Sequence, residues 1–270
     1  MASEQPADGP AVELDGVAVR YGSFPAIQRV AFSVPSGQFV ALVGPTGCGK
    51  SSVLNLVAGL LAPSEGRVAA LGRPVTGVNR QAAYMFQADA LLPWKTALDN
   101  VMLGPLLHGV PRTRAADESR EWLSRVGLAG FEQRYPHQLS GGQRKRVAMA
   151  QALINRLPIL LMDEPFTALD AQTRALMEQE LLGLCSQLGA TVLFVTHDLE
   201  EAIALSDRVI LFTAGPQATL KGDYGVELPR PRNVVEARFM PGFEEVYDRV
   251  WKDLRDEVMA SYEKQRAGAR

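Results

Sequence analysis

A glycine-rich octapeptide between two apolar segments constrains the fold more than any other feature of the chain. The octapeptide is Gly44-Pro45-Thr46-Gly47-Cys48-Gly49-Lys50-Ser51, which fits the phosphate-binding P-loop pattern at every fixed position. The apolar run 39–43 before it predicts a buried strand, and the apolar spacing within 51–61 predicts a helix. This order of strand, turn and helix predicts an α/β fold with a phosphate site at the helix N-terminus.

The residues of the octapeptide have distinct expected roles toward a nucleoside triphosphate such as ATP. Its glycines let backbone amides point at phosphate oxygens, and the helix N-terminus favours negative charge. Lys50 is expected to reach the β- and γ-phosphates and Ser51 to ligate Mg²⁺, and Ser52 is expected to bind the nucleotide together with the octapeptide.

A second candidate segment is the apolar run 159–162, which predicts a strand ending in Asp163-Glu164. Open α/β sheets bind ligands at the carboxyl ends of their strands. We therefore expect Asp163 to hold Mg²⁺ and Glu164 to accept a proton from the attacking water. Apolar runs followed by Asp-Glu are common at strand ends. This one indicates a functional site only because the same chain also contains a P-loop.

The pentapeptide 139–143 opens another predicted helix and supplies a second anion-binding helix N-terminus. Its residues are Leu139, Ser140, Gly141, Gly142 and Gln143. One γ-phosphate can use both elements only if the second comes from another subunit. Here the chain closely resembles the ABC ATPase family, over about residues 12–215. The resemblance implies a P-loop core with an antiparallel edge sheet and an inserted helical sub-domain.

Four further positions match motifs of that family. Tyr21 resembles the aromatic residue that stacks on adenine, although an ordinary strand aromatic is the alternative. Gln87 resembles the glutamine that contacts Mg²⁺ and the attacking water, and His197 resembles the histidine that contacts the γ-phosphate. Asp170 lies in a loop that resembles the one crossing to the partner subunit. Two copies would therefore sandwich two ATP molecules, with Ser140, Gly142 and Asp170 acting across the interface.

Several other residues lie outside these roles. His108 and His137 match no family position and are expected to be structural or on the surface. Residues 144–146, Arg-Lys-Arg, suggest a solvated face with charge near the phosphates rather than a nucleic-acid patch. Gln151 departs from the arginine that many family members carry in this helix. Cys48 is expected to react with alkylating reagents in a way that ATP blocks.

Composition sets the broad class. The 270 residues carry a net charge of −2, which argues against DNA or RNA as the main partner, and two cysteines fit a reducing cytoplasm. No uncharged apolar stretch reaches about 18 residues, so no membrane-spanning helix is expected. We expect a disordered tail at 1–10, an ATPase domain at 11–232 and its helical sub-domain at about 91–156. The expected extension at 233–270 contains an amphipathic helix over 243–262, with Phe243, Val246, Val250, Leu254 and Val258 on one face.

Finer resemblance indicates an importer. Residues 85–94, 98–101 and 227–232 are similar to the nitrate, sulfonate and taurine import branch of the family. The resemblance implies integral membrane permease subunits, a second ATPase copy and, indirectly, a periplasmic or surface solute-binding protein as partners, at the cytoplasmic face of the membrane. The alternatives are a soluble ABC ATPase that acts on nucleic acid or ribosomes, and a regulatory member that binds ATP without hydrolysing it.

Overall fold

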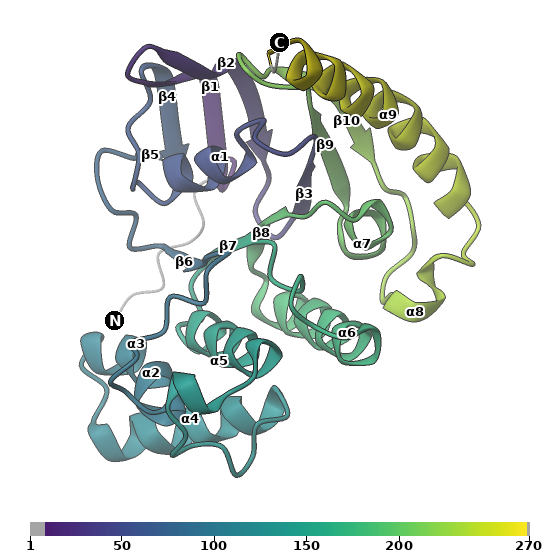
Figure 1. Ribbon diagram of the computed structural model, residues 1–270. Helices are drawn as coiled ribbons and strands as arrows, with labels where there is room; N and C mark the ends of the chain where they lie inside the picture. The colour runs from purple at the N-terminus through teal and green to yellow at the C-terminus, as the bar shows by residue number, and fades with distance from the viewer. Residues whose placement is uncertain (1–8, 269–270) are drawn as a thin grey trace.

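Two β-sheets and several helices make up residues 9–268, the part of the chain that the computed structural model describes (Figure 1). One sheet is antiparallel and has the order β2-β1-β4-β5; its strands are β1 Val12–Tyr21, β2 Phe24–Val34, β4 Glu65–Ala70 and β5 Arg73–Pro74. The other has the order β10-β9-β3-β8-β7-β6 and is parallel except for β10. Its strands are β3 Phe39–Val43, β6 Ala82–Met85, β7 Ile159–Asp163, β8 Thr191–Val195, β9 Arg208–Phe212 and β10 Leu220–Gly225.

Helix α1, Lys50–Val57, packs between the two sheets. The parallel sheet is buried on both faces, which explains its continuous apolar runs. In β3, Phe39, Ala41 and Val43 face one core, while Val40 and Leu42 face the core around α1.

The helices between β6 and β7 gather in a separate lobe below the sheets in Figure 1. They are α2 Ala97–Val101, α3 Leu103–Leu107, α4 Arg112–Arg125, the 3-10 helix η1 Pro136–Gln138 and α5 Gly141–Leu153. The remaining helices are α6 Ala171–Leu188, α7 Leu199–Leu205, α8 Val234–Ala237 and α9 Phe243–Gly268. None of the helices within residues 9–268 is both long and apolar enough to cross a membrane.

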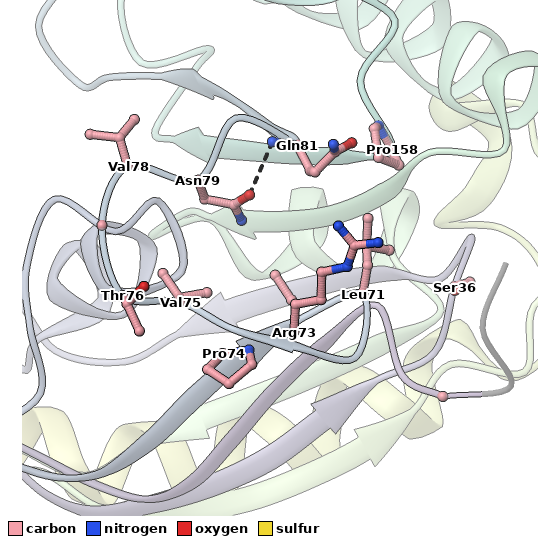
Figure 2. Close-up of a pocket in the computed structure, with 13 residues that line it drawn as sticks. Ser36, Leu71, Arg73, Pro74, Val75, Thr76, Val78, Asn79, Gln81 and Pro158 are labelled. Atoms are coloured by element: carbon pink, nitrogen blue, oxygen red, sulfur yellow. Dashed lines mark hydrogen bonds between the residues drawn. The ribbon is translucent and has the colours of Figure 1, made fainter. Parts of the chain in front are cut away.

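A cavity of about 810 Å³ lies at the amino ends of β6 and β7 (Figure 2). Gln81 and Pro158, which directly precede these strands, line it together with the segment 71–79. The candidate catalytic residues Gln87 and Glu164 follow the same strands at their carboxyl ends. This cavity is therefore at the opposite edge of the sheet from the predicted chemistry.

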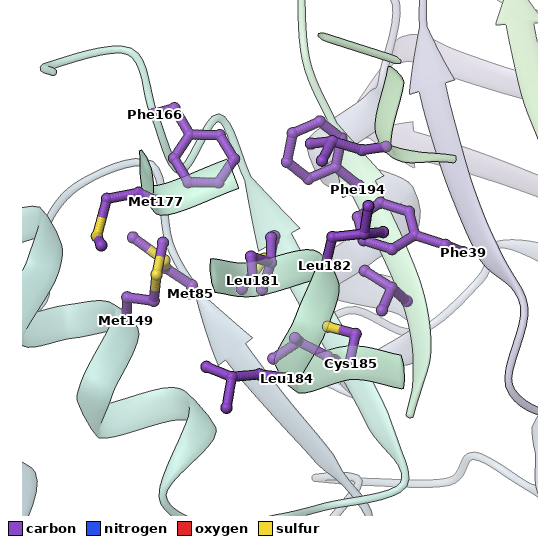
Figure 3. Packing of buried hydrophobic residues seen from close by; sticks show 14 of the residues in the cluster. Phe39, Met85, Met149, Phe166, Met177, Leu181, Leu182, Leu184, Cys185 and Phe194 are labelled. Carbon is purple, nitrogen blue, oxygen red and sulfur yellow. The ribbon is translucent and has the colours of Figure 1, made fainter. Parts of the chain in front are cut away.

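Aromatic and methionine side chains fix helix α6 and the helical lobe to the parallel sheet (Figure 3). The ring of Phe194 on β8 lies 5.7 Å from that of Phe39 and 6.0 Å from that of Phe166. Met85 and Met149 belong to the same core, joining β6 to α5. Each such side chain contributes about 1.5–3 kcal/mol when fully buried, so the loop 164–170 between β7 and α6 starts and ends on well-anchored elements.

The expected fold class is confirmed. The predicted strands 39–43 and 159–162 are β3 and β7, and the apolar pattern also predicts strands at 12–21, 67–71, 82–86, 191–196 and 208–212, which are β1, β4, β6, β8 and β9 to within two residues. Strands β2, β5 and β10 have no predicted counterpart. Register shifts interrupt the pairing of β2 with β1, and they disturb the apolar alternation on which strand prediction depends. Most of the predicted tail, residues 1–8, lies outside the described residues.

The predicted apolar face of α9 is wrong at its last position. Phe243, Val246, Val250 and Leu254 are buried, but Val258 is 41% exposed. At 100° per residue, Val258 lies about 80° around the helix from Val250, whereas position 257 lies within about 20° of it. The side chain that α9 turns inward at this level is therefore Glu257.

Candidate active site

The P-loop requires glycine at two positions by its backbone and its neighbours. Gly44 has φ 149°, and a Cβ there would lie 2.9 Å from the carbonyl oxygen of Phe212. Gly49 has φ 98°, and a Cβ there would lie 2.7 Å from a side-chain carbon of Ile27. Phe212 of strand β9 and Ile27 of strand β2 thus pack against the two ends of the loop so closely that only glycine fits there.

The ammonium group of Lys50 lies across the P-loop. Its Nζ donates to the carbonyl oxygens of Gly44 at 2.8 Å and Pro45 at 3.0 Å. These bonds hold the one cation of the octapeptide against its backbone. Phosphate oxygens that enter the loop would meet an ammonium group that is already ordered.

Cys48 does not have the exposure that the alkylation hypothesis needs. It is fully buried, and its Sγ lies 3.7 Å from the Nζ of Lys50. Burial raises the pKa of the thiol, against the opposing effect of Lys50, so little thiolate is present near neutral pH. Alkylation of Cys48 would therefore require the P-loop to open, and the block of ATP entry by alkylation and the protection by ATP stay predictions.

Asp163, at the end of β7, lies beside Ser51 at the start of α1. The Ser51 hydroxyl hydrogen-bonds the Asp163 carboxyl, which is only 5% exposed. Burial raises the pKa of Asp163, the Ser51 bond and Lys50 oppose this rise, and Glu164 adds to it. A buried carboxyl with a raised pKa gains from a bound cation. Hydroxyl, carboxylate and amide oxygens at Ser51, Asp163 and Gln87 are ligands that Mg²⁺ accepts.

The carboxylate of Glu164 is the point where several predicted residues meet. Its Oε2 accepts from Nε2 of Gln87 at 3.2 Å and lies 3.7 Å from Nδ1 of His197. The hydroxyl of Thr167 lies 3.3 Å from the same oxygen and 3.3 Å from the backbone carbonyl oxygen of Glu164. A carboxylate with this surrounding is oriented for work as a general base.

Glu164 also has an unusual backbone. Its φ is 47°, in the left-handed region, and its N–H donates to the carbonyl oxygen of Val195 at 3.0 Å. A non-glycine residue in this region is strained, and such strain gathers at functional sites. The bond to β8 holds the strained turn in place and directs the side chain toward Gln87 and His197.

Buried polar groups hold the turn that carries His197. The Thr196 hydroxyl donates to Glu201, and the same oxygen accepts from the N–H of Asp198 at 3.0 Å. Glu201 on α7 in turn hydrogen-bonds Glu178 on α6. The position of the candidate histidine thus depends on a carboxyl pair in the interior.

The pentapeptide 139–143 forms the start of α5. Ser140 accepts from the N–H of Gln143 at 3.2 Å, while Gln143 accepts from the N–H of Ser140 at 2.9 Å, which makes a capping box. A Cβ on Gly142 would lie 3.0 Å from Leu169, so the glycine allows close contact with the loop before α6. Gly141 has more space, since its Cβ would meet no atom closer than 3.8 Å.

Asp170 caps helix α6 and stays exposed. Its carboxylate accepts from the N–H of Thr173 at 3.0 Å, and this bond lowers the pKa of Asp170. Among residues 9–268, no hydrogen bond or ion pair joins Asp170 or the pentapeptide to the P-loop of the same chain.

Tyr21 lies near the P-loop helix. Its hydroxyl is 2.9 Å from the hydroxyl of Ser52, and the residue is 50% exposed. A half-exposed ring tethered at its hydroxyl leaves a face open for stacking. Ser52, predicted to bind the nucleotide, thereby anchors the candidate adenine-binding residue.

The Arg-Lys-Arg segment is not a solvated face. Lys145 is 5% exposed and donates to the carbonyl oxygens of Phe86 and Gln87. Arg144 donates to Asp89 at 2.8 Å, and Arg146 donates to the carbonyl oxygens of 126 and 127. The predicted solvation is wrong because α5 packs against the segment that follows β6. The three cations that suggested a nucleic-acid patch are thus hydrogen-bonded to other parts of the same protein.

Three residues without a predicted role in chemistry lie away from Glu164. His108 accepts or donates at Nδ1 with the carbonyl oxygen of Gly104, 3.0 Å away, and the His137 ring stacks 5.8 Å from that of Tyr135. Gln151 contributes its carbonyl oxygen to a bond from Asn155 at 2.8 Å. Thr167 has no counterpart among the predicted site residues, although it lies only three positions after Glu164. The contact of Lys145 with the backbone of Gln87 depends on the fold, since 58 residues separate the two in the sequence.

Comparison with known proteins places this site in a family. The model of the ABC transporter family matches residues 27–167, more than half of the chain. The chain belongs to the ABC transporter family. It is an ABC-type ATPase that binds ATP, and its resemblance to the import branch is confirmed by the relatives described next.

The aliphatic sulfonates import ATP-binding protein of Pseudomonas aeruginosa is 47% identical over 88% of this chain and 83% of its own length. The nitrate transport protein of Klebsiella oxytoca is 40% identical over 84% of this chain and 89% of its own. A solved dimeric ATP-binding cassette bound to ADP and phosphate superposes with a TM-score of 0.72 at 32% identity, covering 81% of this chain and 100% of that one.

Proposed function

We propose that this ABC ATPase is the ATP-hydrolysing subunit of an importer for a small oxygen-rich solute, either nitrate or a sulfonate such as taurine. It would work at the cytoplasmic face of the membrane with integral membrane permease subunits and, indirectly, with a solute-binding protein. Residues 11–232 would be the ATPase domain, 91–156 its helical sub-domain and 233–270 an extension.

One observation carries the catalytic part of this proposal. Gln87, Glu164 and His197 follow three different strands, and their side chains meet at one carboxylate oxygen. Asp163, next to Glu164, hydrogen-bonds Ser51 of the P-loop. A regulatory member that only bound ATP would have no need of an oriented base beside its phosphate loop.

The chemistry requires positioning and charge stabilisation more than covalent participation by the protein. Lys50 and the P-loop amides would hold the phosphates, and Glu164 would accept the proton of the attacking water. His197 would stabilise charge on the γ-phosphate, while Gln87 would orient the water. Mg²⁺, held by Ser51, Asp163 and Gln87, would neutralise the β- and γ-phosphate oxygens when bound. Tyr21 would stack on adenine.

A second copy of the chain would complete each site. Ser140, Gly142 and Asp170 have no bond to the P-loop of their own chain, and the structurally similar cassette is described as dimeric. Ser140 and the amides of 141 and 142 would bind the γ-phosphate held by the partner's P-loop. ATP would then join the two copies and hydrolysis would release them.

Transport by a reconstituted complex tests the proposal. The chain is purified with the permease that co-isolates from native membranes in mild detergent, and the complex is placed in vesicles loaded with ATP. Uptake of labelled nitrate, taurine and a longer alkanesulfonate is measured with the solute-binding protein, with a Glu164→Gln complex as control. ATP-dependent uptake of one anion that the control lacks would support the proposal. Co-isolation of ribosomes or nucleic acid without a permease would contradict it.

A further inference from the structure

The loop between β9 and β10, residues 213–219, forms a wall behind the P-loop. A Cβ on Gly215 would lie 3.2 Å from the carbonyl oxygen of Gly47 and 3.6 Å from the Cα of Cys48. The last residue of β9, Phe212, is closer still to the loop, since a Cβ on Gly44 would lie 2.9 Å from its carbonyl oxygen. The backbone of the P-loop therefore cannot move outward unless this loop moves with it.

The same loop is fixed to strand β2, which touches the P-loop on another side. Ala218 donates to the carbonyl oxygen of Ala26 at 3.1 Å and accepts from the N–H of Gln28 at 2.9 Å. Ile27, between these partners, contacts Gly49. Loop 213–219 and Ile27 thus form one hydrogen-bonded support around the phosphate-binding backbone.

Helix α9 reaches the base of this loop through one carboxylate. The Oε2 of Glu257 accepts from the N–H of Ala214 at 2.8 Å, and its Oε1 lies 3.0 Å from the Nζ of Lys221 on β10. The side chain of Glu257 is 13% exposed, and its two oxygens are both engaged. It is the residue that α9 turns inward where the apolar stripe was predicted to continue.

A second anchor of α9 lies one turn earlier and away from the P-loop. The Tyr224 hydroxyl donates to Asp253 at 2.5 Å, and Arg249 stacks over the Tyr224 ring. This anchor attaches α9 to β10, and in the described part of the chain Asp253 has no hydrogen bond or ion pair with loop 213–219. Asp253 therefore contributes to the docking of the helix alone, whereas Glu257 docks it through Lys221 and also binds the loop.

We propose that Glu257 is a positioning residue for ATP binding, which holds loop 213–219 against Gly47 and Cys48 and so keeps the P-loop amides in their phosphate-binding arrangement. The extension then belongs to the nucleotide site and does more than cover the core. The inference rests on the proposed P-loop site and is independent of what the transporter carries.

Glu257→Ala removes the acceptor, whereas Glu257→Gln keeps an oxygen for the N–H of Ala214 and removes only the charge. We expect Glu257→Ala to raise the dissociation constant for ATP roughly five- to tenfold, because a displacement well under 1 Å is costly at a preorganised site. Turnover at saturating ATP should change less than about twofold, and Glu257→Gln should recover most of the affinity. The full-length protein is used, with equilibrium titration of a fluorescent ATP analogue and steady-state phosphate release.

Asp253→Asn is the matched control, since it weakens the docking of α9 and leaves Glu257 in place. It should lower Tm and leave ATP affinity unchanged. Equal loss of affinity in both variants would mean general loosening and would overturn the positioning role, as would unchanged affinity in Glu257→Ala. Lys50→Ala serves as the reference for a failed site: if it binds ATP like the wild type, the P-loop assignment itself is wrong.

Gly215→Ala tests the contact between loop 213–219 and the P-loop and leaves α9 unchanged. It keeps the proposal testable if the Glu257 variants do not fold. The added methyl meets the carbonyl oxygen of Gly47 and should also raise the dissociation constant for ATP. Wild-type affinity in Gly215→Ala would contradict the step from the loop to the P-loop.

Discussion

The side-chain amide of Gln87 donates to the carboxylate of Glu164, with Nε2 and Oε2 3.2 Å apart. The two residues are separated by the whole helical lobe in the sequence, yet they follow adjacent parallel strands, β6 and β7. The bond thus spans the point where the lobe leaves the sheet and returns to it. A movement of the lobe that pulls on Gln87 would change the surroundings of the candidate base.

Removal of the base should separate ATP binding from hydrolysis. In Glu164→Gln the side chain keeps its size, and Ser51, Lys50 and Asp163 are unchanged, so ATP binding should persist. Hydrolysis should fall about 10²–10⁴-fold, the usual contribution of a general base. Single-turnover phosphate release measures this directly, and near-normal turnover would remove Glu164 from the role.

Lys50→Ala should weaken ATP binding itself, in contrast to Glu164→Gln, which should bind ATP but hydrolyse it slowly. The variant removes the only cation of the P-loop, and the carbonyl oxygens of Gly44 and Pro45 lose their donor. We expect affinity to fall about tenfold or more, since charge-assisted bonds are worth about 1.5–3 kcal/mol. Equilibrium titration at fixed Mg²⁺ is the measurement, and Lys50→Arg shows whether charge without the same geometry is enough.

Thr167 supplies a test that the sequence did not suggest. Its hydroxyl is shared between the backbone and side chain of Glu164. Thr167→Val removes this donor with little change in volume and should lower turnover about three- to tenfold, on the scale of about 1 kcal/mol for one hydrogen bond. Thr167→Ser should behave like the wild type. Equal turnover in all three proteins would show that the Thr167 hydroxyl does not contribute to catalysis by Glu164.

The interior carboxyl pair gives the protein a predicted pH dependence. Burial raises the pKa of Glu178 from 4.5 to about 7 and that of Glu201 to about 8, and each group also feels the other. Arg174 and Arg238 oppose the rise at Glu178, and Asp198 adds to the rise at both. The folded protein therefore holds more protons than the unfolded chain between about pH 4.5 and 8.

Because the protonated pair is favoured by folding, its contribution to stability is fully present below about pH 4.5 and is lost as the pH rises through about 8. Glu178→Gln retains the size of the side chain and can donate to Glu201 at any pH. Its Tm relative to the wild type should rise by about 4 °C or more from pH 6 to pH 8.5, since one pKa unit is about 1.4 kcal/mol and 1 kcal/mol shifts Tm by about 2–4 °C. A parallel pH dependence in the two proteins would show that the pair does not titrate in this range.

The sequence by itself determined the elements whose signal is local. A P-loop needs a strand, glycines at fixed spacing and a helix start, all within about twenty residues, so Gly44 to Ser51 could be placed without a structure. The strand ending in Asp163-Glu164 was equally readable, because strands buried on both faces are continuous apolar runs. The pentapeptide with Ser140 and the resemblance of the family motifs then gave the order of the site residues.

The tertiary structure decided what depends on partners far away in the sequence. Lys145 is buried because α5 packs against the segment after β6, and a run of three cations contains no sign of this. Glu257 reaches Ala214 across 43 residues, and its inward direction follows from the rotation of α9. The carboxyls of Glu178 and Glu201 meet only because α6 and α7 pack together. Periodicity predicts which face of an element is apolar, but the direction and partner of a single polar side chain depend on the neighbour that the fold supplies.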